Sequence, residues 1–273
     1  MIANLQAHYG FSRMPFTASV PAGSLYASAA HKEAVARLRW LISARGLGIV
    51  TGEVGSGKTV ALRAAADGLD ASRNTLIYLP NPQVGVRGVH GVIAQALGKA
   101  PCFYTADLIP QVEAALAAEA DERGRHVILA IDEAHLLTGD QLEAVRMLTN
   151  HDLDSGSPLT VLLIGQPTLR RRLRVGDMAA LDQRVQLRCA IPAPAVTAAE
   201  ADGYLRAHLA LAGRTDTLFS DDAARAIHAH ARGMPRAINK LAVNALLAAY
   251  TAGKTLADES AARTAIAEDT ATD

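Results

Sequence analysis

A glycine-rich segment carries the residues best suited to chemistry. It reads GEVGSGKT, from Gly52 to Thr59, and matches the pattern G-x-x-x-x-G-K-[ST]. Glycines let successive backbone N–H groups curl around phosphate oxygens, the lysine reaches the β- and γ-phosphates, and the threonine hydroxyl can ligate magnesium. The residues expected to bind the nucleotide are Gly52, Glu53, Val54, Gly55, Ser56, Gly57, Lys58, Thr59 and Val60. A glycine-rich turn with a surface lysine is the alternative, but the flanking strand-like and helical stretches favour a phosphate loop.

An acidic pair follows a second apolar run. The segment VILAIDEAH places Asp132 and Glu133 directly after this run. In a phosphate-binding ATPase, the first acid holds magnesium through water and the second polarises the attacking water. An acidic pair at a strand end can also form a solvated turn or a helix cap. With the phosphate loop upstream, we expect Thr59 and Asp132 to hold Mg²⁺ and Lys58 and Glu133 to act in ATP hydrolysis, which favours turnover over a pure binding switch.

Composition limits the compartment and the partners. The chain has 273 residues, with 27 basic and 27 acidic side chains, so its formal net charge is zero. Contact with nucleic acid or a membrane surface would therefore need a local patch. There are two cysteines, the N-terminus lacks the apolar stretch of a signal peptide, and charges and glycines interrupt every long apolar window. We expect a reduced, cytoplasmic protein with no membrane insertion.

Alternating apolar runs and helical patterns indicate the fold class. Segments with apolar residues three and four apart, such as residues 108–124 and 140–153, lie between the runs. The runs are mostly apolar on both faces, as parallel strands between helices are. The pattern predicts an α/β fold with a five-stranded parallel sheet. The five expected strands are residues 46–51, 75–80, 127–132, 159–165 and 185–192.

The pattern changes after Pro192 and Pro194, because only helical periodicity is found beyond them. Three helices are expected at residues 197–213, 220–233 and 235–253, the first two beginning at a Thr and a Ser cap. The predicted domains are an α/β nucleotide-binding core over 1–195, a small all-helical lid over 196–260 and a polar tail over 261–273.

Several motifs occur together in the order and spacing of a known ATPase group. They are the phosphate loop, AIDEAH, LLIGQPTLRRRL, LDQRVQLR and GMPRAINKLAVNALLAA, preceded by GFSRMPF and SLYASAAHKEAVARL. From about Tyr9 to Tyr250 the chain resembles the AAA+ ATPases of the group that contains general secretion pathway protein A (ExeA) and the transposition ATPases TniB and TnsC. The resemblance implies an AAA+ core with a helical lid, ATP and Mg²⁺ as cofactors, and a ring or helical homo-oligomer.

The resemblance also implies roles for single residues outside the loop. Gln166 in LLIGQP is the sensor-1 candidate, Arg184 in DQRV is the arginine finger that acts on a neighbouring subunit, and Arg236 in GMPRA is the sensor-2 candidate. Simpler interpretations stay open: Gln166 as a polar turn residue, Arg184 as a surface residue at the sheet edge. The triplet Arg170–Arg172 fits a solvated helix face as well as an interface or DNA contact.

The relatives within this group differ in function. ExeA proteins carry a membrane-spanning segment and a peptidoglycan-binding region after the ATPase, and neither is found in this sequence up to Asp273. We therefore expect a helper of transposition that assembles on double-stranded DNA and recruits or activates a transposase. Arg87 is a candidate contact to the DNA backbone, and a solvated charge before a helix is the alternative for this residue. The alternatives are an ExeA-type ATPase that energises secretion or envelope assembly, and a nucleotide-gated assembly switch with negligible turnover.

Overall fold

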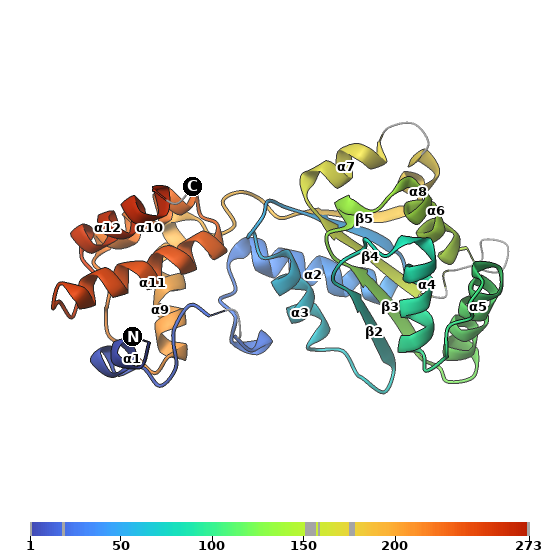
Figure 1. The fold of residues 1–273 in the computed structure, drawn as a ribbon, viewed down its shortest axis with the longest axis horizontal. Coiled ribbons are helices and arrows are strands. Elements are labelled where there is room, and N and C mark those ends of the chain that lie inside the picture. The colour runs from blue at the N-terminus through green and yellow to red at the C-terminus, as the bar shows by residue number, and fades with distance from the viewer. Residues whose placement is uncertain (1, 18–19, 151–156, 158, 175–177, 272–273) are drawn as a thin grey trace. The chain divides into compact units, whose positions relative to one another are not determined.

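The chain divides into two compact units, one α/β and one helical. The computed structural model describes residues 2–17, 20–150, 157, 159–174 and 178–271. Residues 33–54 and 58–191 form the α/β unit, and residues 1–32, 55–57 and 192–273 form the helical unit. Figure 1 shows the strands and helices of both.

The α/β unit is built on five parallel strands. They are β1 (Leu47–Thr51), β2 (Asn74–Leu79), β3 (His126–Ile131), β4 (Leu159–Gly165) and β5 (Val185–Ala190). Their order in the sheet is β2-β3-β4-β1-β5, and every neighbouring pair is parallel. The predicted fold class is confirmed. Because all five carboxyl ends lie at one edge, the segments after β1, β3 and β4 meet there.

Burial separates the central strands from the edge strands. Every residue of β1, β3 and β4 is buried, as the apolar runs predict. The edge strand β2 instead alternates, with Ile77 and Leu79 in the core and Leu76 and Tyr78 each 41% exposed. The other edge strand, β5, also alternates, with Gln186 and Arg188 exposed. The expectation of two apolar faces is therefore wrong for both edge strands, because each leaves one face exposed.

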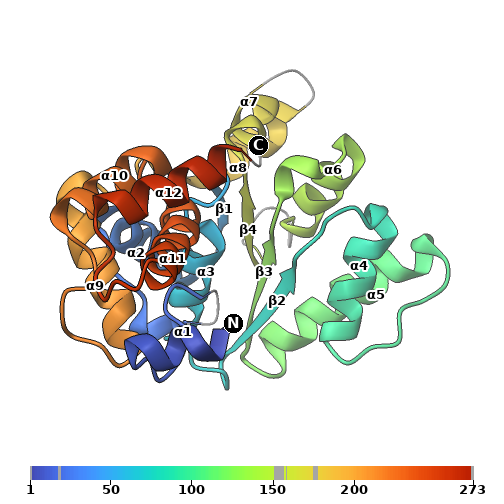
Figure 2. The same cartoon turned by 60° about the vertical axis from the view of Figure 1, so that its left-hand side comes forward.

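Helices cover both faces of the sheet. They are α2 (Ala29–Ala44), α3 (Lys58–Ala66), α4 (Gly85–Ala96), α5 (Thr105–Asp121), the short turn η2 (Ala134–Leu136), α6 (Gly139–Leu148), α7 (Pro167–Leu173) and α8 (Ala179–Arg184). Figure 2 shows α2 and α3 on one side of the strands and α4, α5 and α6 on the other. One continuous core joins Ile49, Leu129 and Leu163 of the sheet to Ile93 and Leu108 of α4 and α5. This packing holds the carboxyl ends of the strands in place.

The helical unit has its own core. Its elements are α1 (Ile2–Tyr9), η1 (Ala22–Ser24), η5 (Ala198–Glu200), α9 (Ala201–Leu211), α10 (Asp221–Ala231), α11 (Pro235–Thr251) and α12 (Glu259–Thr270). Thr197 forms a capping box with Glu200, and the Ser220 hydroxyl accepts a hydrogen bond from the Ala223 N–H, as the two expected caps require. The three helices expected after Pro194 are present.

The two units differ from the expected domains 1–195, 196–260 and 261–273 at both ends of the chain. Residues 1–32 group with the helical unit, where Tyr9 and Phe16 lie in the same core as Leu246 and the Tyr9 hydroxyl donates to the Leu246 carbonyl at 3.0 Å. At the C-terminus, α12 occupies most of the expected polar tail. Two of its alanines, Ala262 and Ala265, are fully buried in that core, so a helix with few large apolar residues still packs.

Candidate nucleotide-binding site

The phosphate loop lies between β1 and α3, in the predicted order of strand, loop and helix. Gly55 and Gly57 have φ angles of +79° and +93°, a region in which residues with a side chain are strained. α3 begins at Lys58, so its first backbone N–H groups come directly after the loop. Unpaired N–H groups at a helix N-terminus attract anions, and the loop therefore has the local geometry of a phosphate site.

Lys58 is held by the loop that precedes it. Its Nζ donates to the carbonyl oxygens of Gly52 and Glu53, each at 2.9 Å. The ammonium group is thus kept beside the loop backbone, where a lysine that contacts nucleotide phosphates has to lie.

Asp132 receives hydrogen bonds from three directions. The Thr59 hydroxyl donates to Asp132 Oδ2 at 2.7 Å, and the Tyr78 hydroxyl donates to the same oxygen at 2.8 Å. The backbone N–H of Glu133 donates to Oδ1 at 2.9 Å. The structure therefore brings Thr59 and Asp132 together as the sequence predicts and adds Tyr78, which the sequence analysis missed. The signal for it was a tyrosine in an otherwise aliphatic strand, TLIYLP.

The Thr59 and Asp132 pair fits magnesium. Asp132 is only 5% exposed, and both residues offer oxygen atoms, the ligands that Mg²⁺ prefers. Magnesium in ATPases is held by one or two protein oxygens together with phosphates and water. Within the described ranges, no group of three or more His, Cys, Asp or Glu side chains could hold a metal by itself. The donor set therefore suits a metal that arrives with a nucleotide.

The hydroxyl group of Tyr78, which contacts Asp132, keeps its proton. Burial, and after it the hydrogen bond to the carboxylate, raises the pKa of the Tyr78 phenol above its ordinary value. The hydroxyl is therefore a hydrogen-bond donor throughout the physiological pH range.

Glu133 occupies a strained backbone position. Its φ and ψ angles are 49° and 33°, the left-handed region that a non-glycine residue adopts at a cost of about 1 kcal/mol or more. The turn is closed by the Leu136 N–H, which donates to the Glu133 carbonyl at 2.8 Å. The Glu133 side chain is 48% exposed, and its Oε2 lies 3.4 Å from His135 Nδ1. A carboxylate in this position is accessible to water.

Gln166 lies at the carboxyl edge of the sheet, directly after β4, as expected. Its backbone N–H points at His135 Nδ1, at a long 3.5 Å. Gly165 also packs tightly against His135, since a Cβ atom added at position 165 would be 3.0 Å from the His135 backbone nitrogen. β4 therefore ends against the turn that carries Glu133.

Arg172 stabilises the η2 turn, which follows Glu133. Its two terminal nitrogens donate to the carbonyl oxygens of His135 at 2.5 Å and Leu137 at 2.7 Å. One member of the triplet Arg170–Arg172 thus has an internal partner, which neither interpretation of the triplet anticipated. The sequence offers no signal for this role, because it depends on the packing of α7 against η2.

Arg184 and Arg236 lie in different units. Arg184 ends α8, and its Nη1 lies 3.4 Å from the carbonyl oxygen of Thr149 at the end of α6. Arg236 lies in the first turn of α11, in the helical unit. The finger and sensor-2 roles of these residues stay predictions.

Arg87 lies in α4 and contacts the segment that follows this helix. Its Nε donates to the Phe103 carbonyl at 3.0 Å and its Nη2 to the Cys102 carbonyl at 3.2 Å. The guanidinium also lies 5.9 Å from the centre of the Phe103 ring. These contacts hold the connection between α4 and α5 against α4. Arg87, which the sequence suggested as a contact to DNA, therefore has a structural role.

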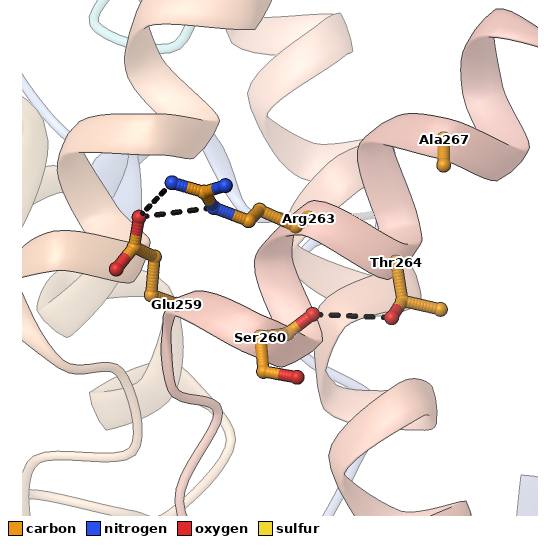
Figure 3. A pocket seen from close by; sticks show the side chains of 5 residues that line it. All are labelled: Glu259, Ser260, Arg263, Thr264 and Ala267. Atoms are coloured by element: carbon orange, nitrogen blue, oxygen red, sulfur yellow. Dashed lines mark hydrogen bonds and ion pairs between the residues drawn. The ribbon is translucent and has the colours of Figure 1, made fainter.

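A surface hollow lies along α12 in the helical unit (Figure 3). The Arg263 side chain donates to Glu259, with its Nη2 at 2.6 Å, and the Thr264 hydroxyl donates to the Ser260 carbonyl at 3.1 Å. These polar groups are paired within the helix itself, and none of them belongs to the residues predicted to bind nucleotide.

Comparison with known proteins identifies the α/β unit. A family model described as "AAA domain" matches residues 41–173, which include the phosphate loop, the acidic pair and Gln166. Residues 41–173 thus match the AAA domain family, and this match supports the predicted ATPase activity. The predicted fold is confirmed.

The chain is also similar to a curated protein. General secretion pathway protein A of Aeromonas hydrophila is 34% identical to it over 253 residues, which are 90% of this chain and 45% of that protein. The chain thus spans less than half the length of this relative. Within the described part of the chain, every helix is too short or too polar to cross a bilayer.

Solved structures share the fold. Cdc6p of Pyrobaculum aerophilum has a TM-score of 0.67 at 18% identity and covers 88% of this chain and 66% of its own. The ADP form of ORC2 of Aeropyrum pernix has a TM-score of 0.68 at 15% identity, covering 93% and 71%. The RuvB branch migration motor of Thermotoga maritima has a TM-score of 0.55 at 16% identity, covering 86% and 68%. Identities this low establish a common architecture alone.

Proposed function

We propose that this AAA+ ATPase supplies energy for secretion or for assembly of the cell envelope. The supporting observation is its 34% identity, across 90% of its length, with general secretion pathway protein A. Such a role would make ATP hydrolysis the energy source for a partner that moves or assembles other molecules. This was the alternative in the sequence analysis, and it now has better support than the transposition role.

The transposition interpretation has weaker support for two reasons. It rested on what ExeA proteins carry beyond the ATPase, whereas the identity covers 90% of this chain and is with a secretion protein. Structures associated with DNA, such as ORC1 of Aeropyrum pernix in complex with DNA, share 15% identity and therefore only the fold. Stimulation of ATP hydrolysis by DNA would instead favour a DNA-bound assembly with a transposase.

The nucleotide site would work through the residues already described. Residues 52–60 would bind the phosphates, with Lys58 on the β- and γ-phosphates. Thr59 and Asp132 would hold Mg²⁺, which neutralises the charge that builds up on the phosphates. Glu133, left accessible by its exposed side chain, would accept a proton from the attacking water. The hydrogen bond between Thr59 and Asp132 supports this arrangement, because it places the two proposed magnesium ligands side by side.

A first experiment tests the activity. Purified protein is assayed for ATP hydrolysis with and without double-stranded DNA, together with Lys58→Ala and a control variant, Lys254→Ala. Lys254 pairs with Asp258 between α11 and α12 and lies outside the proposed site. We expect turnover in the wild type and the control, loss of turnover in Lys58→Ala, and no stimulation by DNA. Strong stimulation by DNA would favour the transposition interpretation.

A second experiment tests the process. In the organism that encodes this protein, the gene is deleted and complemented with wild type, Lys58→Ala or Lys254→Ala, and exported proteins are quantified. The proposal expects export to fail in the deletion and with Lys58→Ala, and to recover with the other two. Normal export and a normal envelope in the deletion strain would contradict it.

A further inference from the structure

Tyr78 reaches Asp132 because of the register between two strands. Tyr78 pairs with Ala130, two residues before Asp132, and side chains two apart in a strand share a face. Ala130 contributes only a methyl group, so the phenol can extend past it. The Asp132 N–H donates to the Leu79 carbonyl at 2.9 Å, which continues the pairing one residue beyond β3. The position of the Tyr78 hydroxyl is therefore set by the sheet itself.

The three donors at Asp132 fill most of its acceptor sites. A carboxylate offers about four lone-pair positions, two on each oxygen. Thr59 and Tyr78 occupy both positions on Oδ2, and the Glu133 N–H occupies one on Oδ1. Among the residues that the structure describes, this leaves one position on Oδ1. Asp132 can therefore accept one more hydrogen bond, which suits a single metal-bound water.

We propose that Tyr78 is a positioning residue for magnesium: its hydroxyl fixes the Asp132 carboxylate so that the remaining position on Oδ1 faces a water of the metal. This inference rests on the proposed magnesium site. Without the hydroxyl, Oδ2 keeps only the bond from Thr59, which is also a proposed metal ligand. The carboxylate can then rotate, and its alignment toward the metal-bound water is lost. Partners of this kind commonly change metal affinity by about 10- to 100-fold when they are removed.

Tyr78→Phe tests the proposal because it removes one oxygen atom and keeps the ring. Tyr104→Phe is the matched control, since Tyr104 is an exposed tyrosine between α4 and α5. Binding of a non-hydrolysable ATP analogue is measured by fluorescence at rising Mg²⁺ concentrations and in EDTA. We expect Tyr78→Phe to need about tenfold more Mg²⁺ for half-maximal binding, with unchanged affinity in EDTA. The control should match the wild type in both.

Two other outcomes are distinguishable. Identical Mg²⁺ titrations for Tyr78→Phe and wild type, while Asp132→Asn shifts the curve, would overturn the role of Tyr78 and leave the magnesium site intact. A wild type whose nucleotide binding does not depend on Mg²⁺ would overturn the magnesium site and the role of Tyr78 with it. Equal thermal unfolding temperatures of Tyr78→Phe and Tyr104→Phe would show that a difference in Mg²⁺ dependence does not come from a loss of stability.

Discussion

The Thr59 hydroxyl donates a 2.7 Å hydrogen bond to Asp132 Oδ2 across 73 residues of sequence. Thr59 is the second residue of α3, and Asp132 comes directly after β3, so the bond joins the phosphate loop to the acidic pair. Neither a threonine at a helix start nor an acid after a strand indicates a metal site by itself. Together they form the pair of oxygen ligands on which the proposed magnesium site depends.

Replacing Glu133 should separate binding from hydrolysis. Glu133→Gln keeps the size of the side chain but removes the carboxylate that would accept a proton, so turnover should fall by about 100-fold or more while ATP still binds. Phosphate release and nucleotide titration measure the two effects. Glu143→Gln is the control, because Glu143 pairs with Arg146 on α6. Wild-type turnover in Glu133→Gln would mean that another group activates the water.

Adding one methyl group at Gly165 should disturb the turn of Glu133. The new Cβ would lie 3.0 Å from the His135 backbone nitrogen, and backbone cannot move aside as a flexible side chain can. Gly165→Ala should therefore lower the free energy of unfolding by about 1–3 kcal/mol and reduce turnover. Chemical denaturation and ATPase assays measure both.

The control for Gly165 is Gly91 in α4. Outside the backbone of its own helix, an added Cβ there would meet no atom of the described residues within 4 Å. Gly91→Ala should be neutral or stabilise the protein by up to about 1 kcal/mol, because alanine is the better helix former. Equal stability and turnover of Gly165→Ala and wild type would show that β4 and the His135 turn separate easily.

Mixing inactive variants tests whether Arg184 acts on a neighbouring subunit. Arg184→Ala should be inactive alone and should regain part of its turnover when mixed with Lys58→Ala, because some interfaces then pair an intact arginine with an intact loop. The assay is ATP hydrolysis at a fixed total concentration, with mixed assembly checked by light scattering or cross-linking. Mixed assemblies without activity would count against the role in trans.

Low pH should weaken the helical unit through His208. This side chain stacks on Phe16, with ring centroids 5.2 Å apart, and lies 4.7 Å from the Tyr204 ring. Burial lowers its pKa from 6.5 to about 4. The unfolded chain therefore binds a proton between these pH values and the folded chain does not, so stability rises with pH through this window and is lost as pH falls from 6.5 toward 4.

Thermal unfolding between about pH 7 and pH 4 measures this effect. His208→Phe should flatten the dependence of the melting temperature on pH, because the titrating ring is gone while its aromatic contacts are kept. His8, an exposed histidine that contacts the Lys254 carbonyl, provides the control variant His8→Phe. Equal slopes for wild type and His208→Phe would contradict the assignment.

Local sequence determined the parts of this protein that depend on neighbouring residues. The phosphate loop, the acidic pair and the five strands are encoded in short segments, because glycine spacing and continuous apolar runs restrict the backbone and its burial directly. The helix caps at Thr197 and Ser220 were predicted for the same reason. Strand β2 shows the limit, since its residues resemble a buried strand and only its place at the sheet edge exposes Tyr78.

Tertiary structure decided the contacts that depend on distant segments. The order β2-β3-β4-β1-β5 sets β4 between β3 and β1, and so brings Gly165 and His135 together. The hydrogen bonds of Tyr78 to Asp132 and of Arg172 to the η2 turn, and the grouping of residues 1–32 with the helical unit, arise in the same way. No local pattern specifies these contacts, because each is made between surfaces that exist only after the elements have packed.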